Sequence, residues 1–352
     1  MNNLLVNKRI DYIDTARGMS LLAVIMGHII FKQAQTFQFV DAFLYAFHLP
    51  LFFIISGYLF KPDHSPKEFI IKKVKGYVIP YIFCAVVISV YFILFRIIDN
   101  GAEGLWRYII FNVVRTFTLQ MRFTTLWFLT ALFCAEVFLY FLFLICDKRD
   151  VLVWLIAVIL GFFFVIYNMN EMHPLPWNAD VSFVVVPLLL FGYTLKQYDF
   201  FNRQEVRGLF VPLLLMFLGA ICAVCNFIVT GGKCLDMFAG QYHCLPLVLI
   251  SAISLSVSII LLSAKIKIRV LRWLGANTMV FFAFHQSIAM DLSRRILSPF
   301  WNIDASASSL IMQILVVIVM LSMVLAICYV IHRAILKSGL GFLIGKKNRQ
   351  TT

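Results

Sequence analysis

The sequence predicts an all-α, polytopic membrane protein with about ten transmembrane helices and with both termini in the cytoplasm. Of its 352 residues, 62% are hydrophobic and only 13% are charged, and the mean hydropathy is +0.92. Soluble globular domains have about 45–50% apolar and about 25% charged residues. This composition excludes an ordinary soluble enzyme, a disordered chain and a small secreted module held together by disulfides.

Apolar stretches of roughly the 20 residues that a bilayer-spanning helix needs recur along the whole chain. They leave only short loops and tails, so we expect one transmembrane domain over residues 1–352 and no separate soluble domain. Residues 104–118 are expected to form a short interfacial helix. The expected spans are 14–33, 39–60, 77–98, 125–146, 151–168, 181–196, 208–230, 244–264, 277–296 and 308–334.

Topology, rather than a nucleic-acid partner, explains the net charge of +13. With a cytoplasmic N-terminus, most Lys and Arg residues fall in cytoplasmic loops and tails, as the positive-inside rule requires. The chain begins with a polar segment, and the first span carries Asp14 and Arg17, so we do not expect a cleavable signal peptide. The sequence therefore predicts a multi-pass protein of the inner (cytoplasmic) membrane, surrounded by membrane lipids.

The first span has the densest set of ionisable residues. Asp14 and Arg17 are three residues apart and can pair on one helix face. His28 follows Arg17 by eleven residues, which places it within about 20° of Arg17 around the helix and about 16 Å further along its axis. Each ionisable group at the bilayer centre costs about 2.5–3.5 kcal/mol, which favours a functional role. The alternative is that Asp14 and Arg17 mark the headgroup boundary and that His28 reaches outward to it.

The second span combines a histidine, a proline and a Ser-Gly-Tyr sequence in one apolar run. Pro50 interrupts the helical hydrogen bonds, and the freed backbone groups are tolerated in lipid only beside protein or a water-filled cavity. His48 precedes this break and either takes part in chemistry or only caps the freed carbonyls. Ser56 and Tyr58 are candidates for the lining of a channel.

A basic cluster follows the second span. We expect a loop there to bring Lys72, Lys73 and Lys75 to the cytoplasmic mouth of the third span. Such a cluster is explained by topology alone, but beside a cavity it also suits a ligand that carries phosphate groups.

Polar residues are sparser in the later spans. Trp127 opens the fourth span, as an interfacial anchor or a platform for a sugar, and Glu136 behind it either pairs with a cation of a neighbouring span or lines a pocket. The ninth span contains His285, which has no charged partner on its own helix and is expected to bind an acceptor or to be structural. The spans at 151–168, 208–230 and 244–264 contain no charged residue.

These motifs resemble the acyltransferase-3 family of integral-membrane O-acyltransferases. The resemblance rests on D-x-x-R with a histidine eleven residues later, on F-H-x-P-L-F-F-x-x-S-G-Y, and on the basic pair Lys72 and Lys75 before a Pro-Tyr membrane entry. Leu126-Trp127-Phe128-Leu129 and the late Gly275-Ala276-Asn277-Thr278 with His285 are weaker matches. The fucose 4-O-acetylase-like sugar O-acetyltransferases are the most similar group. Many members have Arg where this chain has lysines, and Lys keeps the charge but lacks a bidentate fork.

The resemblance implies transfer of an acyl group, usually acetyl, from cytoplasmic acyl-CoA to a hydroxyl of an envelope polysaccharide or a lipid-linked sugar. His28 would be the general base or a transient acyl carrier. Arg17, oriented by Asp14, would bind the donor or stabilise charge at the thioester, and Lys72 and Lys75 would hold the CoA phosphates. Acetyl-CoA is then a co-substrate, and we expect no bound cofactor and no metal.

A second hypothesis remains at this stage. A proton-coupled transporter or flippase of an envelope glycan precursor could use Asp14, Arg17, His28 and Glu136 as a proton pathway. Secondary transporters often have inverted repeats with matching broken spans, and the sequence contains no such pair.

Overall fold

Helices make up nearly the whole of the computed structural model, which describes residues 10–30, 34–118, 124–147, 149–170, 175–299 and 309–346. The last residues of the expected span 14–33 and the first of 308–334 lie outside these ranges. The helices are α1 (Asp11–Ile30), α2 (Ala34–Phe47), α3 (Pro50–Tyr58), α4 (Pro66–Lys73), α5 (Ile79–Asn100), α6 (Leu105–Phe117), α7 (Trp127–Ile145), α8 (Asp150–Met169), α9 (Ala179–Gln197), α10 (Phe210–Val229), α11 (Leu245–Ser263), α12 (Arg269–Ala276), α13 (Thr278–Phe284), α14 (Asp291–Leu297) and α15 (Leu310–Lys337).

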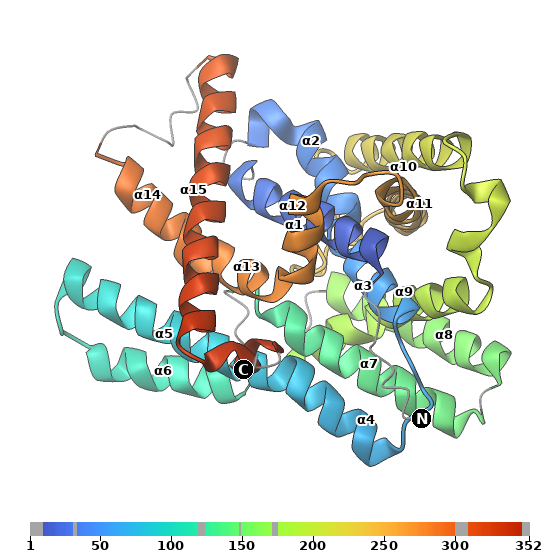
Figure 1. Ribbon diagram of the computed structural model, residues 1–352, viewed down its shortest axis with the longest axis horizontal. Coiled ribbons are helices and arrows are strands. Elements are labelled where there is room, and N and C mark those ends of the chain that lie inside the picture. The colour runs from blue at the N-terminus through green and yellow to red at the C-terminus, as the bar shows by residue number, and fades with distance from the viewer. Residues whose placement is uncertain are drawn as a thin grey trace, which may run out of the picture.

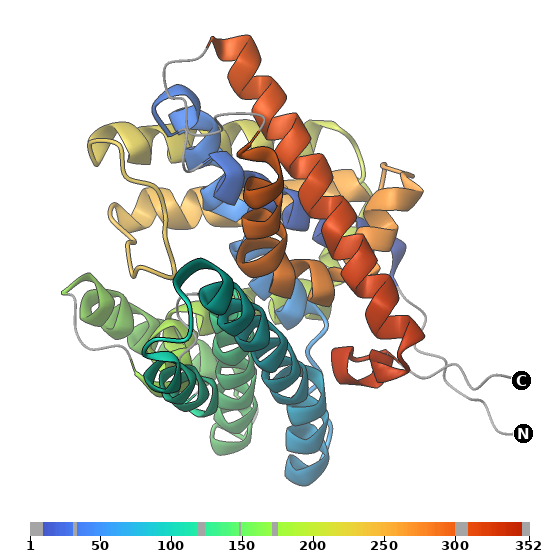
Figure 2. The ribbon, with the colours of Figure 1, turned by 90° about the vertical axis from the view of Figure 1, so that its left-hand side faces the viewer.

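The expected all-α, polytopic membrane architecture is confirmed. Within the described ranges, nine helical segments are long and apolar enough to cross a membrane, and they coincide with all but one of the expected spans. The segment 104–118, expected to form a short helix, contains α6, which lies beside α5 (Figures 1 and 2).

The exception is the span expected at 277–296, which is broken into shorter pieces. Asn277 departs from helical geometry (φ −120°, ψ 21°) and separates α12 from α13. A wider π-helical turn, η6 (His285–Met290), then joins α13 to α14. π-Helical turns inside helices frequently occur at functional sites, and this one begins at His285.

Helix α1 is the central element of the bundle. It contacts α2, α3, α11, α12, α13 and α15, and 72% of its most apolar stretch is buried in protein, against 22% for α8 and for α15. The long helix α15 runs along one side of the molecule (Figure 1). Asp14 and His28 therefore lie on a helix that is surrounded mostly by protein rather than lipid, as a functional role requires.

The two ends of the described chain meet on one side. Arg272 at the start of α12 pairs with Asp11 of α1 at 2.6 Å, and Lys346, after α15, donates a hydrogen bond of 2.8 Å to the Ala276 carbonyl. An even number of crossings requires both ends on the same side, which agrees with the expected topology. We call this the cytoplasmic side, after the basic loops that lie there.

Paired glycines bring α3 and α9 into close contact. Gly57 of α3 lies against the backbone of Leu189, and Gly192 of α9 lies against the backbone of Ile54. A Cβ atom at either glycine would overlap backbone atoms of the other helix. Small residues of this kind let transmembrane helices pack at short range.

The same reciprocal arrangement joins α1 to α12. Gly18 lies against the backbone of Leu271, and Gly275 lies against the carbonyl group of Asp14. The Gly275-Ala276-Asn277-Thr278 sequence thus holds the backbone of Asp14 in place.

We expect the substitution Gly192→Ala to destabilise the bundle by about 1–3 kcal/mol, because the added methyl group overpacks a backbone contact. Gly76→Ala is the matched control, since no atom lies within 4 Å of a Cβ atom built there, and a change within about 1 kcal/mol is expected. Thermal unfolding of both purified variants in the same detergent measures the difference. Equal midpoints would contradict the role of the glycine contact.

Candidate functional site

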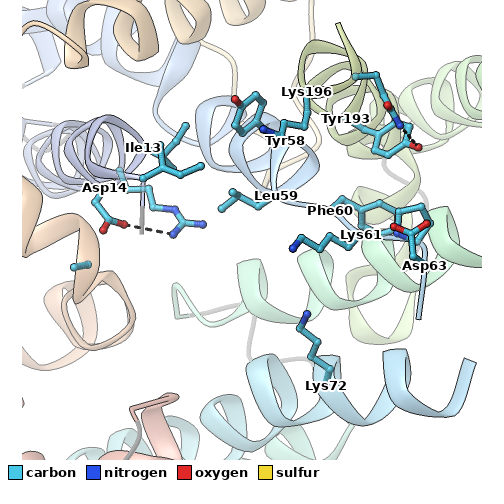
Figure 3. A pocket seen from close by; sticks show the side chains of 15 residues that line it. Ile13, Asp14, Tyr58, Leu59, Phe60, Lys61, Asp63, Lys72, Tyr193 and Lys196 are labelled. Carbon is cyan, nitrogen blue, oxygen red and sulfur yellow. Dashed lines mark hydrogen bonds and ion pairs between the residues drawn. The ribbon is translucent and has the colours of Figure 1, made fainter. Parts of the chain in front are cut away.

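One cavity lies at the cytoplasmic end of α1. Its volume is about 700 Å³. Asp14 and Arg17 pair at its wall with a separation of 3.9 Å, shown by the dashed line from Asp14 in Figure 3. The lining residues are Ile10, Ile13, Asp14, Arg17, Tyr58, Leu59, Phe60, Lys61, Pro62, Asp63, Lys72, Tyr193, Lys196, Gln197 and Ala276.

Positive charge dominates this cytoplasmic cavity. The ammonium groups of Lys61 and Lys72 point into the same open space (Figure 3), and the Lys196 ammonium lies 5.1 Å from the centre of the Tyr58 ring. An excess of cations in a cavity of this size suits an anionic ligand, phosphate groups above all. The cations in the wall are Arg17, Lys61, Lys72 and Lys196, and the carboxylates are Asp14 and Asp63.

The sequence predicted that the three lysines of the basic cluster lie in a loop. That prediction is wrong, because the structure places them on a continuous helical segment. Ser65 and Glu68 form a capping box that starts α4 early, and α4 continues through the π-helical segment η2 (Val74–Val78) into α5. The lysines therefore face different surroundings. Lys72 lines the cytoplasmic cavity, Lys73 points to α7, and Lys75 is exposed outside that lining.

Lys73 and Glu136 form an ion pair at the centre of a buried polar network. The Glu136 side chain is 2% exposed and that of Lys73 is 15% exposed. The Glu136 carboxylate also accepts hydrogen bonds from Ser56 at 2.5 Å and from Tyr77 at 3.1 Å. The network joins α3, α4, η2 and α7, so Ser56 faces Glu136 rather than the cytoplasmic cavity. Of the two possibilities for Glu136, pairing with a cation is the one observed.

The second span breaks at His48, just before Pro50, which cannot continue the helical hydrogen bonds. Helix α2 ends at Phe47, and Pro50 begins α3 at its first turn. The His48 ring donates from Nδ1 to the Leu44 carbonyl at 2.7 Å, and the His48 carbonyl accepts a hydrogen bond of 2.5 Å from Ser20. The Leu44 carbonyl already accepts the backbone amide of His48 at 3.0 Å, so the ring does not cap a carbonyl that Pro50 leaves free. His48 also lines a second cavity, described next.

A second cavity lies toward the other end of α1, and we call it the outer cavity. Its volume is about 200 Å³. Trp127 is only 6% exposed and packs on Phe238 at 5.7 Å between ring centres, so it lines this cavity from within the protein rather than lying at its outer surface. The lining residues are Val24, His28, Tyr45, His48, Leu49, Thr124, Thr125, Trp127, Asp236, Phe238, Phe282 and Gln286.

Asp236 gives the wall of the outer cavity a carboxylate. It lies in the loop between α10 and α11, and its Oδ1 atom accepts hydrogen bonds of 3.0 Å from the backbone amides of Phe238 and Ala239. Burial raises the pKa of the Asp236 carboxyl above its usual range, and those amides oppose the shift. Such a carboxyl can exchange hydrogen bonds with a polyol.

His285 lies directly beside His28. The two ring centres are 5.3 Å apart, although the residues belong to different spans. His285 is completely buried. In the described part of the chain, no group of three or more His, Cys, Asp and Glu side chains is placed to hold a metal ion.

The Asp14–Arg17 pair was predicted, but several partners of the other predicted site residues were not. Lys61, Lys196, Asp236 and the pairing of Lys73 with Glu136 were not predicted. The only local signal was the four-residue spacing of Lys73 and Tyr77, which lets one helical segment present both side chains to Glu136.

Comparison with known proteins agrees with these observations. A family model described as an acyltransferase domain, Acyl_transf_3, matches residues 10–333. The match covers most of the chain, including both cavities. Neither the curated proteins nor the solved structures contain a match.

Proposed function

Because the chain belongs to the Acyl_transf_3 family of acyltransferases, we propose that it is a membrane O-acyltransferase that uses cytoplasmic acyl-CoA. The acyl group, acetyl in this proposal, passes to a hydroxyl of an envelope polysaccharide or a lipid-linked sugar at the inner membrane. The fucose 4-O-acetylase-like group is the proposed subgroup. One observation carries the proposal: a single helix, α1, lines a cationic cavity at one end and a histidine-containing cavity at the other.

The cytoplasmic cavity is the proposed donor site. CoA carries several phosphate groups, and Arg17, Lys61, Lys72 and Lys196 surround the space that they would enter. Asp14 pairs with Arg17 and limits the directions that its guanidinium can take. The pantetheine arm would then run along α1 and carry the thioester toward His28, about 16 Å from Arg17 along the helix axis.

His28 is the proposed base. It would remove the proton of the acceptor hydroxyl while the hydroxyl oxygen attacks the thioester carbonyl carbon. The C–S bond then breaks, and the CoA thiolate leaves with the proton that His28 returns. In a two-step variant, a His28 nitrogen attacks the thioester first and later passes the acyl group to the hydroxyl.

The outer cavity is the proposed acceptor site. Trp127 supplies an apolar face for a sugar ring, and Thr124, Asp236 and Gln286 supply hydrogen-bonding groups for hydroxyls. His48 lines the same wall. Tyr58 belongs to the donor side, where its hydroxyl group and that of Tyr12 form a hydrogen bond of 3.0 Å.

Two measurements test the proposed function. Purified protein should transfer or slowly hydrolyse the acyl group of acetyl-CoA, and mass spectrometry of envelope glycans from cells without the gene should show the loss of one acyl group. Uptake of a glycan precursor into proteoliposomes, driven by a pH gradient and without any acyl donor, would favour the transporter instead.

We expect Lys72→Met to raise KM for acyl-CoA by about 3–10-fold, because one charge-assisted phosphate contact contributes about 1 kcal/mol at a partly exposed site. The kcat value should change little, since Lys72 lies far from His28. Lys75→Met is the matched control and should leave KM unchanged, because Lys75 is exposed outside the cavity. Equal effects of the two substitutions would show that only the overall surface charge matters.

A further inference from the structure

His285 has one ring nitrogen whose protonation is fixed by its surroundings. Its Nδ1 atom lies 3.0 Å from the Phe281 carbonyl oxygen and 2.9 Å from that of Phe282. Carbonyl oxygens only accept hydrogen bonds, so Nδ1 must carry the proton. In a neutral imidazole the other nitrogen, Nε2, then has a free lone pair and can only accept.

The Nε2 atom of His285 is buried and has no hydrogen-bond partner among the described residues. A buried polar atom without a partner costs about 1–3 kcal/mol, so such an atom in a folded protein requires an explanation. The backbone around it is held firmly, because Thr125 donates a hydrogen bond of 2.8 Å to the same Phe282 carbonyl. The ring is therefore fixed, and its free nitrogen faces a site that another donor can fill.

The ring of His28 is in the right position to be that donor. A hydrogen bond between two imidazole nitrogens of about 2.9 Å places the ring centres about 5 Å apart. The observed separation is 5.3 Å, with an angle of 37° between the ring planes. At this separation an N–H group of the His28 ring is within reach of the Nε2 atom of His285.

We propose that His285 is a positioning residue, whose Nε2 atom accepts a ring N–H of His28 and so fixes the His28 tautomer. The other His28 nitrogen is then unprotonated and faces the outer cavity, as a base or nucleophile requires. When His28 takes up a proton, the same hydrogen bond stabilises the imidazolium. The inference rests on the proposed role of His28 in acyl transfer.

Two substitutions separate this role from a structural one. The amide of asparagine can occupy the position of Nδ1, whereas the longer side chain of glutamine places its amide oxygen near the position of Nε2. His285→Asn should therefore keep the backbone contact and lose the acceptor, and His285→Gln should keep the acceptor. We expect kcat to fall on the order of 10²-fold in His285→Asn, as for a misplaced catalytic group, and only a few-fold in His285→Gln, with KM little changed in either.

A structural role predicts the reverse order, with the asparagine variant active and the glutamine variant impaired, and that result would overturn the proposal. Equal activity of both variants would overturn it as well. His332 supplies the control, because it is buried on α15 and lines neither cavity. Its Asn and Gln variants should not show the split.

Nitrogen-15 NMR of histidine-labelled protein tests the inference independently of acyl transfer. The His28 signals, assigned by their loss in a His28 variant, should report one neutral tautomer in the native protein and a mixture in His285→Asn. A native His28 that populates both tautomers equally would overturn the proposal, even if neither His285 variant folds. Inactivity toward acyl-CoA with a single His28 tautomer would instead contradict only the proposed function.

Discussion

Replacing His28 with alanine is expected to lower kcat for acyl transfer by about 10²–10⁴-fold, the contribution of a well-placed general base. The thermal midpoint should change little in comparison, because His28 lines a cavity and is only partly buried. Transfer from radiolabelled acetyl-CoA to an acceptor glycan measures the activity. The expected loss is the largest that any single side chain of the outer cavity should produce.

Two further measurements sharpen this result. Added imidazole should partly restore activity to His28→Ala, since the outer cavity has room for a free ring once the side chain is removed. His243→Ala is the matched control, because His243 lines neither of the two cavities, and it should keep full activity. Full activity in His28→Ala would show that another group takes the proton.

The same variant decides whether His28 carries the acyl group. In the absence of acceptor, an acyl carrier should retain label from radiolabelled acetyl-CoA on the native protein and lose it in His28→Ala. A general base retains no label in either protein. Both results keep His28 in the mechanism, but they assign it different chemistry.

The spans and the Asp14–Arg17 pair follow from the sequence because both depend on local features. Hydropathy marks a helix without reference to its neighbours, and a three-residue spacing brings two side chains together on any helix. His28 could be found in the same way, from its position relative to Arg17. Its contact with His285 could not, because these residues come from different spans and only the folding of the chain brings them together.

Lys72 and Lys75 show that sequence spacing alone does not always predict which way a side chain points. Three residues apart on a regular helix, they would share a face, and the sequence predicted one role for both. The π-helical segment η2 begins at Val74, and its wider turn changes the direction of the residues that follow. Lys72 therefore lines the cytoplasmic cavity and Lys75 does not. A π-helical turn has no reliable signature in a single sequence.

Removing only one partner of the buried ion pair is expected to destabilise the protein strongly. Lys73→Met would leave the Glu136 carboxylate in a site that is 2% exposed, where Ser56 and Tyr77 remain as its hydrogen-bond partners among the described residues. An uncompensated buried charge costs about 3–5 kcal/mol. Glu136→Gln should be costly as well, because Lys73 lies among the rings of Phe60, Phe69 and Tyr77 and, within the described part of the chain, pairs with no second carboxylate.

The double variant Lys73→Met/Glu136→Gln distinguishes a paired charge from two independent contributions. It removes both charges, so it should recover much of the stability that either single variant loses. Thermal unfolding in one detergent compares the set, and Lys75→Met, an exposed site, should stay within about 0.5 kcal/mol of the native protein. Additive losses in the double variant would mean that the two charges do not stabilise each other. Recovery of stability without recovery of acyl transfer would mean that the pair also shapes the donor site, since α4 supplies both Lys73 and the cavity residue Lys72.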